Sequence, residues 1–485
     1  MPMVVPHVSV TEQTESEGAG TLKIACTFHP VAHAYSRGEI MRMRHFAARM
    51  FAATLVASLG VFALPAKAAH DQGDAAVIIE WNQLAQRHVA GPPFAQNRSF
   101  AMVHVAMADA VVAIEGRYDA FHVSMRAPGG ASAEAAAAQA AHDVLVFLVP
   151  GATAASDAAL ATRLATISPG KRSHGVQVGQ KVAAAVLAWR ANDGFAAANP
   201  QPPTILASTL PGIWRPTASG PAQFSKLGDV EPFGLLTSTQ FLPTPYPQLE
   251  SAKYAEDFNE VKNEGRRPSS FPAGPFTANQ RTALLWAGGA GTPYANVTSA
   301  LRLWHNVARD VAQAESLSLV QTARLFALLT TSIHDSVQTS HTSKFAYRLW
   351  RPETAIDQAG VDNNPNTAAE TGWVPLLLTP PYPSHSSNMT CIGAGAGRML
   401  ANIFNTDAKS FTVTWYASDT VTPPATTPPV VHSQAHNSFR ALAQEEGDSR
   451  IWGGIHFRFE IDASLDSCSD VADYLFDNYM QSRAN

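Results

Sequence analysis

Most of the chain carries the apolar periodicity of α-helices, and this pattern limits the folds that are open to it. Apolar residues, many of them Ala and Leu, recur at intervals of three to four, which places them on one face of a helix. No long stretch of alternating apolar and polar residues competes with that pattern. It predicts an all-α fold with helices over residues 74–90, 98–115, 132–149, 154–167, 175–193, 278–288, 298–313, 316–338, 387–404, 432–447 and 467–482.

Proline-rich stretches interrupt this helical pattern in two places. Prolines are frequent between Pro200 and Pro247, and proline disrupts both helices and central strands. We therefore expect residues 196–277 to form an extended connecting segment between an N-terminal helical bundle, residues 69–195, and a C-terminal bundle, residues 278–485. Residues 405–430, which end in two Pro-Pro pairs, are expected to be a second irregular stretch.

The first 68 residues have the character of a targeting sequence. A basic region begins at Met41, residues 50–64 are apolar, and Ala66-Lys67-Ala68 fits the small-x-small rule for signal peptidase. Residues 1–68 are therefore expected to be an upstream extension plus a signal peptide, with the mature chain beginning at Ala69 in the periplasm or outside the cell. A signal anchor is the alternative, although the apolar stretch is short for a spanning helix. No later stretch is apolar enough for stable membrane insertion.

Composition excludes a nucleic-acid partner and leaves the cysteines open. Only 15% of residues are charged, the net charge is -5, and no basic run is present. Cys391 and Cys468 could form a disulfide in an oxidising compartment, or they could be two buried thiols. His432 and His436 lie one helical turn apart in the predicted helix, but no third metal ligand is evident beside them.

Three separated motifs bring cations, a hydroxyl and imidazoles together. They are Lys344 with Arg351-Pro352, then Pro383-Ser384-His385-Ser386, and then Arg450 with His456. An oxyanion in a partly dry pocket needs several charge-assisted hydrogen bonds. Arginine supplies them as a planar fork and lysine as a point charge, so the two types complement each other. The ordered set therefore predicts an oxyanion-binding site.

Two other segments imitate functional motifs and are expected to be structural. Trp214-Arg215-Pro216 resembles Trp350-Arg351-Pro352, but Ser208 stands where a lysine would be needed, so it is expected to be a loop. The small residues Gly393–Gly397 follow no clear strand, which argues against a dinucleotide site. Close packing between helices is their expected role.

The spacing K-x6-R-P, P-S-x-x and S-R-x5-H resembles the signature shared by vanadium-dependent haloperoxidases and the acid phosphatases related to type 2 phosphatidic acid phosphatases. Residues Trp452–Arg458 resemble the bacterial haloperoxidase-like branch. The resemblance implies two packed helical bundles, with the site in the C-terminal one. It also implies that His456 ligates vanadate. The residues that would bind the oxygens of the vanadate are Lys344, Arg351, Ser384 and Arg450.

Two positions depart from the family pattern. The third and fourth residues of the middle motif are usually Gly and His, whereas here they are His385 and Ser386. Either His385 takes the acid–base role one residue early, which we favour, or Ser386 occupies that position and the role is lost. The family also has Asp four residues after the metal-ligating His. Here Glu460 occupies that position, and we expect it to orient the His456 ring through Nδ1.

The expected activity is oxidation of a halide by hydrogen peroxide at a His456-ligated vanadate. The first alternative is an acid phosphatase that cleaves a phosphate ester through a phosphohistidine intermediate and needs no vanadate. A second alternative is a degenerate oxyanion-binding protein, which would follow if Ser386 replaces the acid–base histidine. The expected partners are small molecules, and a homodimer is one expected assembly.

Overall fold

The computed structural model describes residues 6–7, 27–28, 74–200, 208–287, 299–416 and 430–483 of the chain. The predicted extension and signal peptide, residues 1–68, lie outside the described residues except for β1 (Pro6–His7) and β2 (Thr27–Phe28), which pair antiparallel. These strands belong to the unit Met1–His70, whereas Asp71–Asn485 forms a second compact unit. Signal cleavage before Ala69 stays a prediction.

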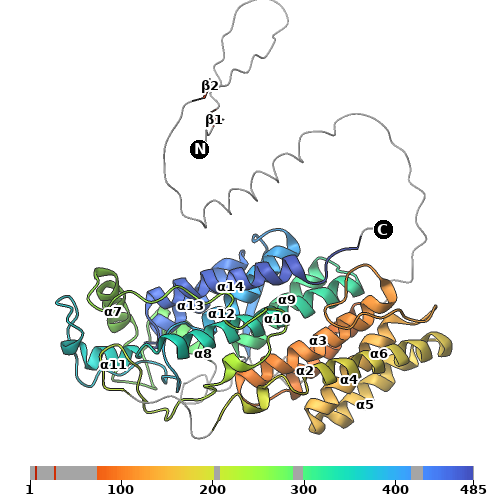
Figure 1. The fold of residues 1–485 in the computed structure, drawn as a ribbon, viewed down its shortest axis with the longest axis horizontal. Coiled ribbons are helices and arrows are strands. Elements are labelled where there is room, and N and C mark those ends of the chain that lie inside the picture. The colour runs from red at the N-terminus through yellow and green to blue at the C-terminus, as the bar shows by residue number, and fades with distance from the viewer. Residues whose placement is uncertain are drawn as a thin grey trace, which may run out of the picture. The chain divides into compact units, whose positions relative to one another are not determined.

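Helices make up most of the second unit, which confirms the predicted all-α fold (Figure 1). The earlier helices are α2 (Ala76–His88), α3 (Pro93–Glu115), α4 (Ala133–Leu148), α5 (Thr153–Ala165) and α6 (Pro169–Arg190). The later helices are α7 (Ala252–Glu264), α8 (Ala278–Ala287), α9 (Ala300–Ala314), α10 (Leu319–Tyr347), α11 (Pro352–Asp357), α12 (Asn388–Phe404), α13 (Phe439–Trp452) and α14 (Arg458–Asn478). Short 3-10 turns lie at Pro150–Ala152, Phe195–Ala197, Leu227–Asp229 and Ala359–Val361. The predicted boundaries of the two bundles stay predictions.

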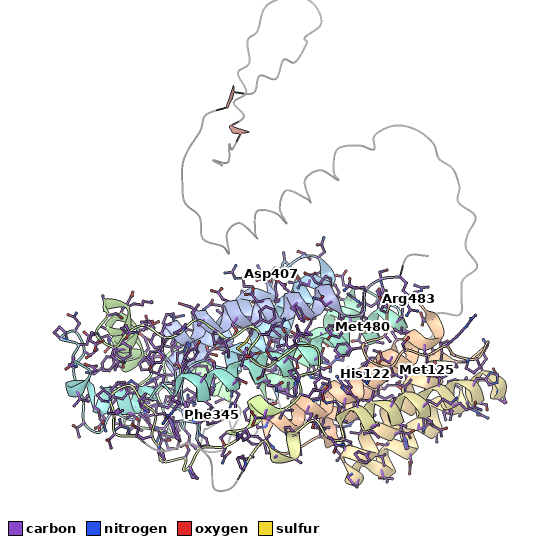
Figure 2. The ribbon with its side chains drawn as sticks, in the orientation of Figure 1. His122, Met125, Phe345, Asp407, Met480 and Arg483 are labelled. Carbon is purple, nitrogen blue, oxygen red and sulfur yellow. A yellow bond between two sulfur atoms is a disulfide. The ribbon has the colours of Figure 1, made fainter. Side chains whose placement is uncertain are left out.

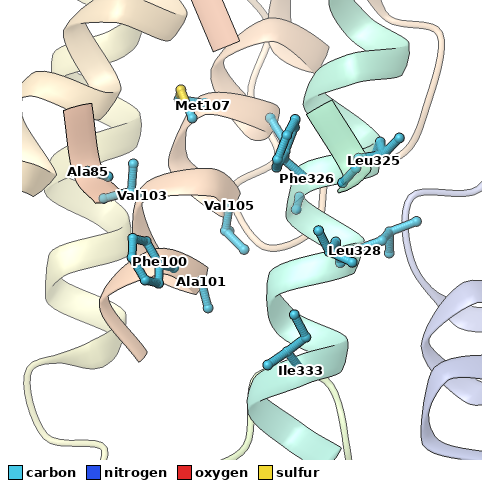
Figure 3. Packing of buried hydrophobic residues seen from close by; sticks show 14 of the residues in the cluster. Ala85, Phe100, Ala101, Val103, Val105, Met107, Leu325, Phe326, Leu328 and Ile333 are labelled. Atoms are coloured by element: carbon cyan, nitrogen blue, oxygen red, sulfur yellow. The ribbon is translucent and has the colours of Figure 1, made fainter. Parts of the chain in front are cut away.

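The central packing contact joins α3 to α10. Val103 and Val105 on α3 and Leu328 on α10 are fully buried in one hydrophobic cluster, and Figure 3 shows both helices contributing side chains to it. The His104 ring on α3 stacks on Phe326 of α10 with 5.0 Å between centroids. Because α10 also packs on α12 and α14, it connects the earlier helices to those that carry the site motifs.

A buried aspartate in each of these two central helices holds a loop. Asp109 on α3 accepts backbone N–H bonds of 2.6–2.9 Å from residues 121–123. Asp335 on α10 accepts bonds of 2.8–3.1 Å from residues 233–235. Burial raises the pKa of Asp109 to about 6, although the three N–H groups oppose that rise. Both carboxylates therefore anchor segments that would otherwise leave buried N–H groups unpaired.

The predicted helix over residues 432–447 is wrong in its first part. Residues Val430–His436 form strand β4, which pairs antiparallel with β3 (Phe411–Tyr416), and α13 begins only at Phe439. The predicted irregular stretch, residues 405–430, thus contains β3. The buried Trp415 of β3 packs edge to face on Trp286 of α8, with centroids 5.6 Å apart, and this aromatic contact stabilises the hairpin.

The two histidines of this segment therefore lie on a strand and not on a helix. His432 pairs in register with Trp415, and His436 pairs with Phe411. Within the described part of the chain, no group of three or more potential metal-ligating side chains is present.

The Pro-rich connecting segment contains a helix that was not predicted. Ser251 caps the N-terminus of α7 by accepting the backbone N–H of Tyr254 at 3.1 Å. Tyr254, Phe258 and Val261, at helical spacing, are completely buried in a cluster with Trp350. That cluster lies beside the first site motif, so α7 helps to fix the position of Arg351. The rest of residues 208–277 is irregular, as predicted, apart from the short turn at residues 227–229.

The small residues of α12 permit close helix packing, as predicted. A Cβ atom on Gly395 would lie 2.5 Å from Ser336 Oγ on α10. The main-chain oxygen of Gly395 also accepts a 2.9 Å hydrogen bond from Ser332. Glycine is therefore needed here because the two helix backbones approach each other directly.

Two further links join distant segments of the second unit. Cys391 of α12 and Cys468 of α14 form a disulfide, so the open choice between pairing and free thiols is decided in favour of pairing. The chain after α14 contacts the segment after α3, where Arg483 Nε donates to Asp119 Oδ1 at 2.8 Å. Figure 2 labels Arg483 and the nearby Met480 at this end of the chain. Across the described residues, we find no helix with the length and apolar character of a membrane span.

Candidate functional site

Lys344 lies in the last turn of α10 and connects the first two motifs. Its side chain is completely buried, and its Nζ donates to the main-chain oxygens of Ser384, at 2.7 Å, and of Ser386. Burial and the nearby Arg351 hold the pKa of Lys344 well below its usual range, whereas Glu460 opposes that shift. The amine thus fixes the path of the middle motif beside α10.

Arg351 is the N-cap residue of α11 and is also completely buried. Its Nε donates to Tyr382 O at 2.9 Å, and its Nη1 donates to Ile455 O at 2.9 Å. Burial lowers the pKa of this guanidinium, although nearby Tyr382 and Glu460 oppose the shift. Nη2 is buried and has no hydrogen-bond partner among the described residues. Such an unpaired charged donor is costly in a dry interior, so Arg351 offers an unused N–H group to an anion.

His456 and Glu460 form a pair at the start of α14. His456 Nδ1 lies 3.0 Å from Glu460 Oε2, and His456 Nε2 lies 3.2 Å from Arg351 Nη1. Burial, followed by the charges of Arg351, Lys344 and Arg450, holds the pKa of His456 well below its usual range. The ring is therefore neutral. Nδ1–H donates to Glu460, and the Nε2 lone pair faces the cations.

Glu460 connects the second and third motifs. Its Oε2 accepts hydrogen bonds from the backbone N–H of Phe457 at 2.8 Å and from Ser384 Oγ at 2.9 Å, besides that from His456. Burial raises the pKa of Glu460 to about 7, against the opposing charges of Lys344 and Arg351. The predicted contact between Glu460 and His456 Nδ1 is thus present in the structure. Ser384, expected to face the anion directly, donates to Glu460.

Arg450 completes the cation set from the end of α13. Its Nε and Nη2 donate to Ser449 Oγ at 2.9 and 2.8 Å. Burial lowers the pKa of Arg450 to about 10, opposed by Glu446 and Tyr382. The charge of Arg450 also acts on His456. The charges of Lys344, Arg351 and Arg450 therefore all act on His456, and we call these three residues the cation cage.

The two residues that depart from the family pattern point in different directions. His385 Nε2 donates to Thr244 O at 2.8 Å, and its buried Nδ1 has no hydrogen-bond partner among the described residues. Burial lowers the pKa of His385 to about 4, so the ring is neutral and Nδ1 carries a lone pair. Ser386 Oγ bonds to Ser340 and Ser343 of α10 at 3.1 and 3.2 Å. Of these two residues, only His385 therefore has a free proton acceptor.

Sequence reasoning missed three polar residues beside the cage. The Tyr382 ring lies 5.3 Å from Lys344 Nζ and 5.3 Å from Arg351 Cζ. Asn388, the first residue of α12, interacts with the Tyr382 phenol, and its Nδ2 lies 3.1 Å from His341 Nδ1. Their only sequence signal is proximity to the motifs: Tyr382 directly precedes the middle motif, Asn388 follows it by two residues, and His341 precedes Lys344 by three.

The near copy of the first motif packs against the original. Trp214 N donates to Arg348 O at 2.7 Å, and Trp350 N donates to Gly212 O at 2.8 Å. Arg215 Nη1 donates to the side chain of Gln358 at 2.8 Å. The copy is thus an irregular segment, as predicted, and Arg215 has a structural partner.

Glu446 is a buried carboxyl group one helical turn before Arg450. Its Oε2 accepts a 2.7 Å bond from Trp304 Nε1, whereas Oε1 has no hydrogen-bond partner among the described residues. Burial raises its pKa to about 8, opposed by the Trp304 bond and the Arg450 charge. The glycine at position 393 leaves room for this carboxyl, because a Cβ there would collide with Oε2.

We expect Glu446→Gln to flatten the pH dependence of stability. The folded pKa of about 8 exceeds the unfolded value of 4.5. The stabilising effect of the bound proton is therefore complete below the unfolded pKa and is lost as the pH rises through about 8. The free energy of unfolding is measured by chemical denaturation at pH 5 and at pH 9. The difference between the two values should be smaller in the variant than in the wild type, by on the order of a few kcal/mol.

Glu445→Gln is the matched control, because Glu445 accepts a 3.0 Å bond from Trp286 Nε1 but is only half-buried. Equal pH dependence in wild type and Glu446→Gln would contradict this expectation.

Comparison with known proteins identifies the site-bearing region. A model of the VCPO second helical-bundle domain matches residues 324–485, which include all three motifs. The solved structure of a bacterial vanadium-dependent iodoperoxidase matches with a TM-score of 0.67 and 22% identity, covering 84% of this chain and 97% of that one. No curated protein matches the chain at a significant level.

A bacterial vanadium-dependent chloroperoxidase is similar in fold as well. Its holo form matches with a TM-score of 0.61 and 16% identity over 82% of this chain and 96% of that one. Its apo form matches with a TM-score of 0.59 and 16% identity over 81% and 95%. At these identities the likeness establishes the fold, and the roles of individual side chains have to be argued from their own chemistry.

Proposed function

Because residues 324–485 match the VCPO second helical-bundle domain and the fold matches solved vanadium haloperoxidases, we propose that this chain belongs to the superfamily of vanadium haloperoxidases and type 2 phosphatidic acid phosphatases and is a vanadate-dependent haloperoxidase. The observation that carries this proposal is the neutral His456, whose Nε2 lone pair faces Arg351 within the cation cage. An imidazole nitrogen that is free of its proton and surrounded by cations is suited to ligate the central atom of a bound oxyanion.

The residues of the cage fit vanadate as a cofactor. Vanadate carries several negative charges, and the buried cations Lys344, Arg351 and Arg450 would compensate them. The unpaired Nη2 of Arg351 would gain the acceptor that it lacks among the described residues. His456 would be the protein ligand to vanadium, held in one tautomer by Glu460.

The reaction is a two-electron oxidation of a halide. A halide ion, hydrogen peroxide and a proton give hypohalous acid and water, so the halide is oxidised and the peroxide is reduced. Bound vanadate supplies Lewis-acid activation of the peroxide. The protein must therefore hold the cofactor, exclude competing water and accept the proton that peroxide loses.

His385 is the residue that we propose as this proton acceptor. Its Nε2–H is engaged by Thr244, which leaves Nδ1 as the acceptor. The ring lies near enough to the cage for its charge to act on His456 and for the Lys344 charge to act on it. A pKa of about 4 keeps the ring neutral at neutral pH, so Nδ1 is unprotonated there.

One pair of assays tests the proposal directly. Purified protein is incubated with orthovanadate or with a vanadate-free buffer. Halogenation of monochlorodimedone is then measured with chloride, bromide and iodide, alongside hydrolysis of p-nitrophenyl phosphate. We expect halogenation only after vanadate loading, and no comparable hydrolysis. Hydrolysis by the vanadate-free protein, inhibited by added vanadate, would identify a phosphatase instead.

We expect His385→Ala to lower turnover by about 10² to 10⁴-fold, the usual contribution of a general acid–base group. Vanadate affinity should change little, because the cation cage and His456 remain. Turnover measured at saturating vanadate, together with calorimetric titration of vanadate, separates these effects. The matched control is His88→Ala, a histidine at the end of α2. A nearly silent His385→Ala variant, with a Ser386→His variant that gains activity, would place the acid–base position at residue 386.

The proposed cellular location of the protein follows from the N-terminal sequence, most of which lies outside the described residues. We propose export to the periplasm or the medium through the predicted signal peptide, which follows the upstream extension within residues 1–68. Export agrees with the Cys391–Cys468 disulfide, since such bonds persist in oxidising compartments. The proposed partners are hydrogen peroxide and a halide, and a homodimer stays a prediction. Intact mass of the secreted protein tests the cleavage site before Ala69.

A further inference from the structure

We propose that Tyr382 is a further anion-binding residue of the cation cage, and that its phenolic hydroxyl donates a hydrogen bond to the bound oxyanion. This inference rests on the proposed function, because it requires that the cage holds an oxyanion. It assigns a role to a residue outside the three motifs and adds a neutral proton donor to a site otherwise made of cations and imidazoles.

Main-chain and side-chain contacts both fix Tyr382 at the cage. Its carbonyl oxygen accepts the 2.9 Å bond from Arg351 Nε. Its ring lies over the ammonium of Lys344 and the guanidinium of Arg351, each 5.3 Å from the ring centroid. Cations at that distance are attracted to the face of an aromatic ring. Tyr382 is therefore held between two members of the cage.

The charge of the third member, Arg450, acts on the phenol as well. Burial raises the pKa of Tyr382, and the charges of Arg351 and Arg450 act against that rise. Reciprocally, the phenol acts on the pKa of both arginines. The hydroxyl is therefore protonated at neutral pH, on a ring that lies beside Lys344 and Arg351.

Asn388 is a polar neighbour of the phenol, and its side chain lowers the pKa of Tyr382. Its Nδ2 lies 3.1 Å from His341 Nδ1, and its buried Oδ1 has no hydrogen-bond partner among the described residues. Asn388 Oδ1 and a bound anion are therefore the two acceptors open to the hydroxyl proton of Tyr382.

The charged groups that act on this phenol cannot accept its proton. Besides Asn388, the phenol interacts with Arg351 and Arg450, which are donors only. The Nη2 of Arg351 is likewise without a hydrogen-bond partner among the described residues. One oxyanion placed between them would accept from both the hydroxyl and the guanidinium. His341 and Asn388 act through Tyr382, and we therefore assign them positioning roles.

Calorimetric titration of the full-length mature protein with orthovanadate, and separately with inorganic phosphate, tests the inference. We expect Tyr382→Phe to raise the dissociation constant of both anions about tenfold or more, the usual effect of losing a hydrogen bond to a charged group. Tyr479→Phe is the matched control. Tyr479 also loses one phenolic hydrogen bond, the 2.8 Å bond to Gly234 O, but it is outside the cage, so its anion affinities should equal those of the wild type.

A second variant and a spectroscopic measurement guard against a purely structural effect. Asn388→Ala keeps the hydroxyl but removes its orientation, so we expect a smaller loss of affinity and no further loss when it is combined with Tyr382→Phe. Phosphate should also produce a tyrosine difference spectrum in the near ultraviolet with wild-type protein and with Tyr479→Phe, but not with Tyr382→Phe. A structural role would not remove that spectrum from a folded variant.

The outcomes separate this inference from the proposed function. Unchanged or tighter anion binding by Tyr382→Phe, with normal binding by the wild type, would overturn the role of Tyr382 and leave the haloperoxidase proposal intact. If the wild-type protein binds neither vanadate nor phosphate, both proposals fall. A phosphate-induced difference spectrum that persists in folded Tyr382→Phe would also overturn the inference.

Discussion

Replacement of His456 by alanine is expected to abolish vanadate-dependent halide oxidation. His456 is the imidazole whose Nε2 faces Arg351 of the cation cage, whereas His385, the other imidazole of the three motifs, is bonded to Thr244. The loss should exceed the about 10 to 100-fold cost of removing an outer partner of a metal ligand. Turnover at increasing vanadate concentrations measures it, because a protein without the ligand should not recover at high vanadate.

The control for this variant is His122→Ala. His122 precedes all three motifs in the sequence. Its ring stacks on Trp189, with 3.9 Å between the ring centroids. The variant removes an imidazole of the same size without touching the cage, so its activity should equal that of the wild type. Turnover of His456→Ala near the wild-type level would remove His456 from the mechanism.

Replacement of Arg351 by alanine is expected to weaken vanadate or phosphate binding by about 2–5 kcal/mol, the cost of breaking a desolvated charge pair. Arg351 donates to the main-chain oxygens of Tyr382 and Ile455, and its Nη2 has no hydrogen-bond partner among the described residues. Its loss therefore removes one anion contact and loosens the position of Tyr382. Arg351→Lys should restore little of the affinity, since lysine lacks the planar fork.

Calorimetric titration with both anions measures this effect, and Arg215→Ala provides a matched control from the near copy of the motif. Arg215 is bonded to Gln358 and should leave anion affinity unchanged. Thermal unfolding of both variants separates a loss of stability from a loss of binding. An anion affinity that is equal in Arg351→Ala and in the wild type would place Arg351 outside the cage.

The helices could be predicted where one face of the segment is buried. The segment of α10 is a partial exception. The predicted helix stopped at residue 338, whereas the structure continues it to Tyr347. The missing turns are rich in Ser and Thr, which have low helix propensity, yet Ser340 and Ser343 are buried against the middle motif. Tertiary contacts therefore override local preference along this part of the helix.

The hairpin could not be predicted because its evidence is not local. Residues Val430–His436 continue the apolar spacing of α13 closely enough to be read as its first turns. Their strand partner, Phe411–Tyr416, lies elsewhere in the sequence. Only the pairing of the two segments, together with the packing of Trp415 on Trp286, makes a strand the better choice.

The candidate site was predictable where residue type and spacing carry the chemistry. Lys344, Arg351 and Arg450 were singled out in this way, and the charges of all three act on His456, whereas their roles stay predictions. The orientation of the middle motif was not predictable, because whether Ser384 faces the anion or Glu460 depends on the path of the main chain. Tyr382 follows no spacing rule, so only its ring position over two cations reveals it.

The disulfide between Cys391 and Cys468 has a consequence for the integrity of the molecule. Cys391 follows the middle motif closely, Cys468 follows His456, and 77 positions separate the two cysteines. A protease that cuts the backbone anywhere between them leaves two fragments that are still joined through sulfur. When the cut precedes His456, one fragment carries Lys344 and Arg351, and the other carries His456. In an extracellular setting, a nicked molecule would therefore keep both halves of its site until a reductant separates them.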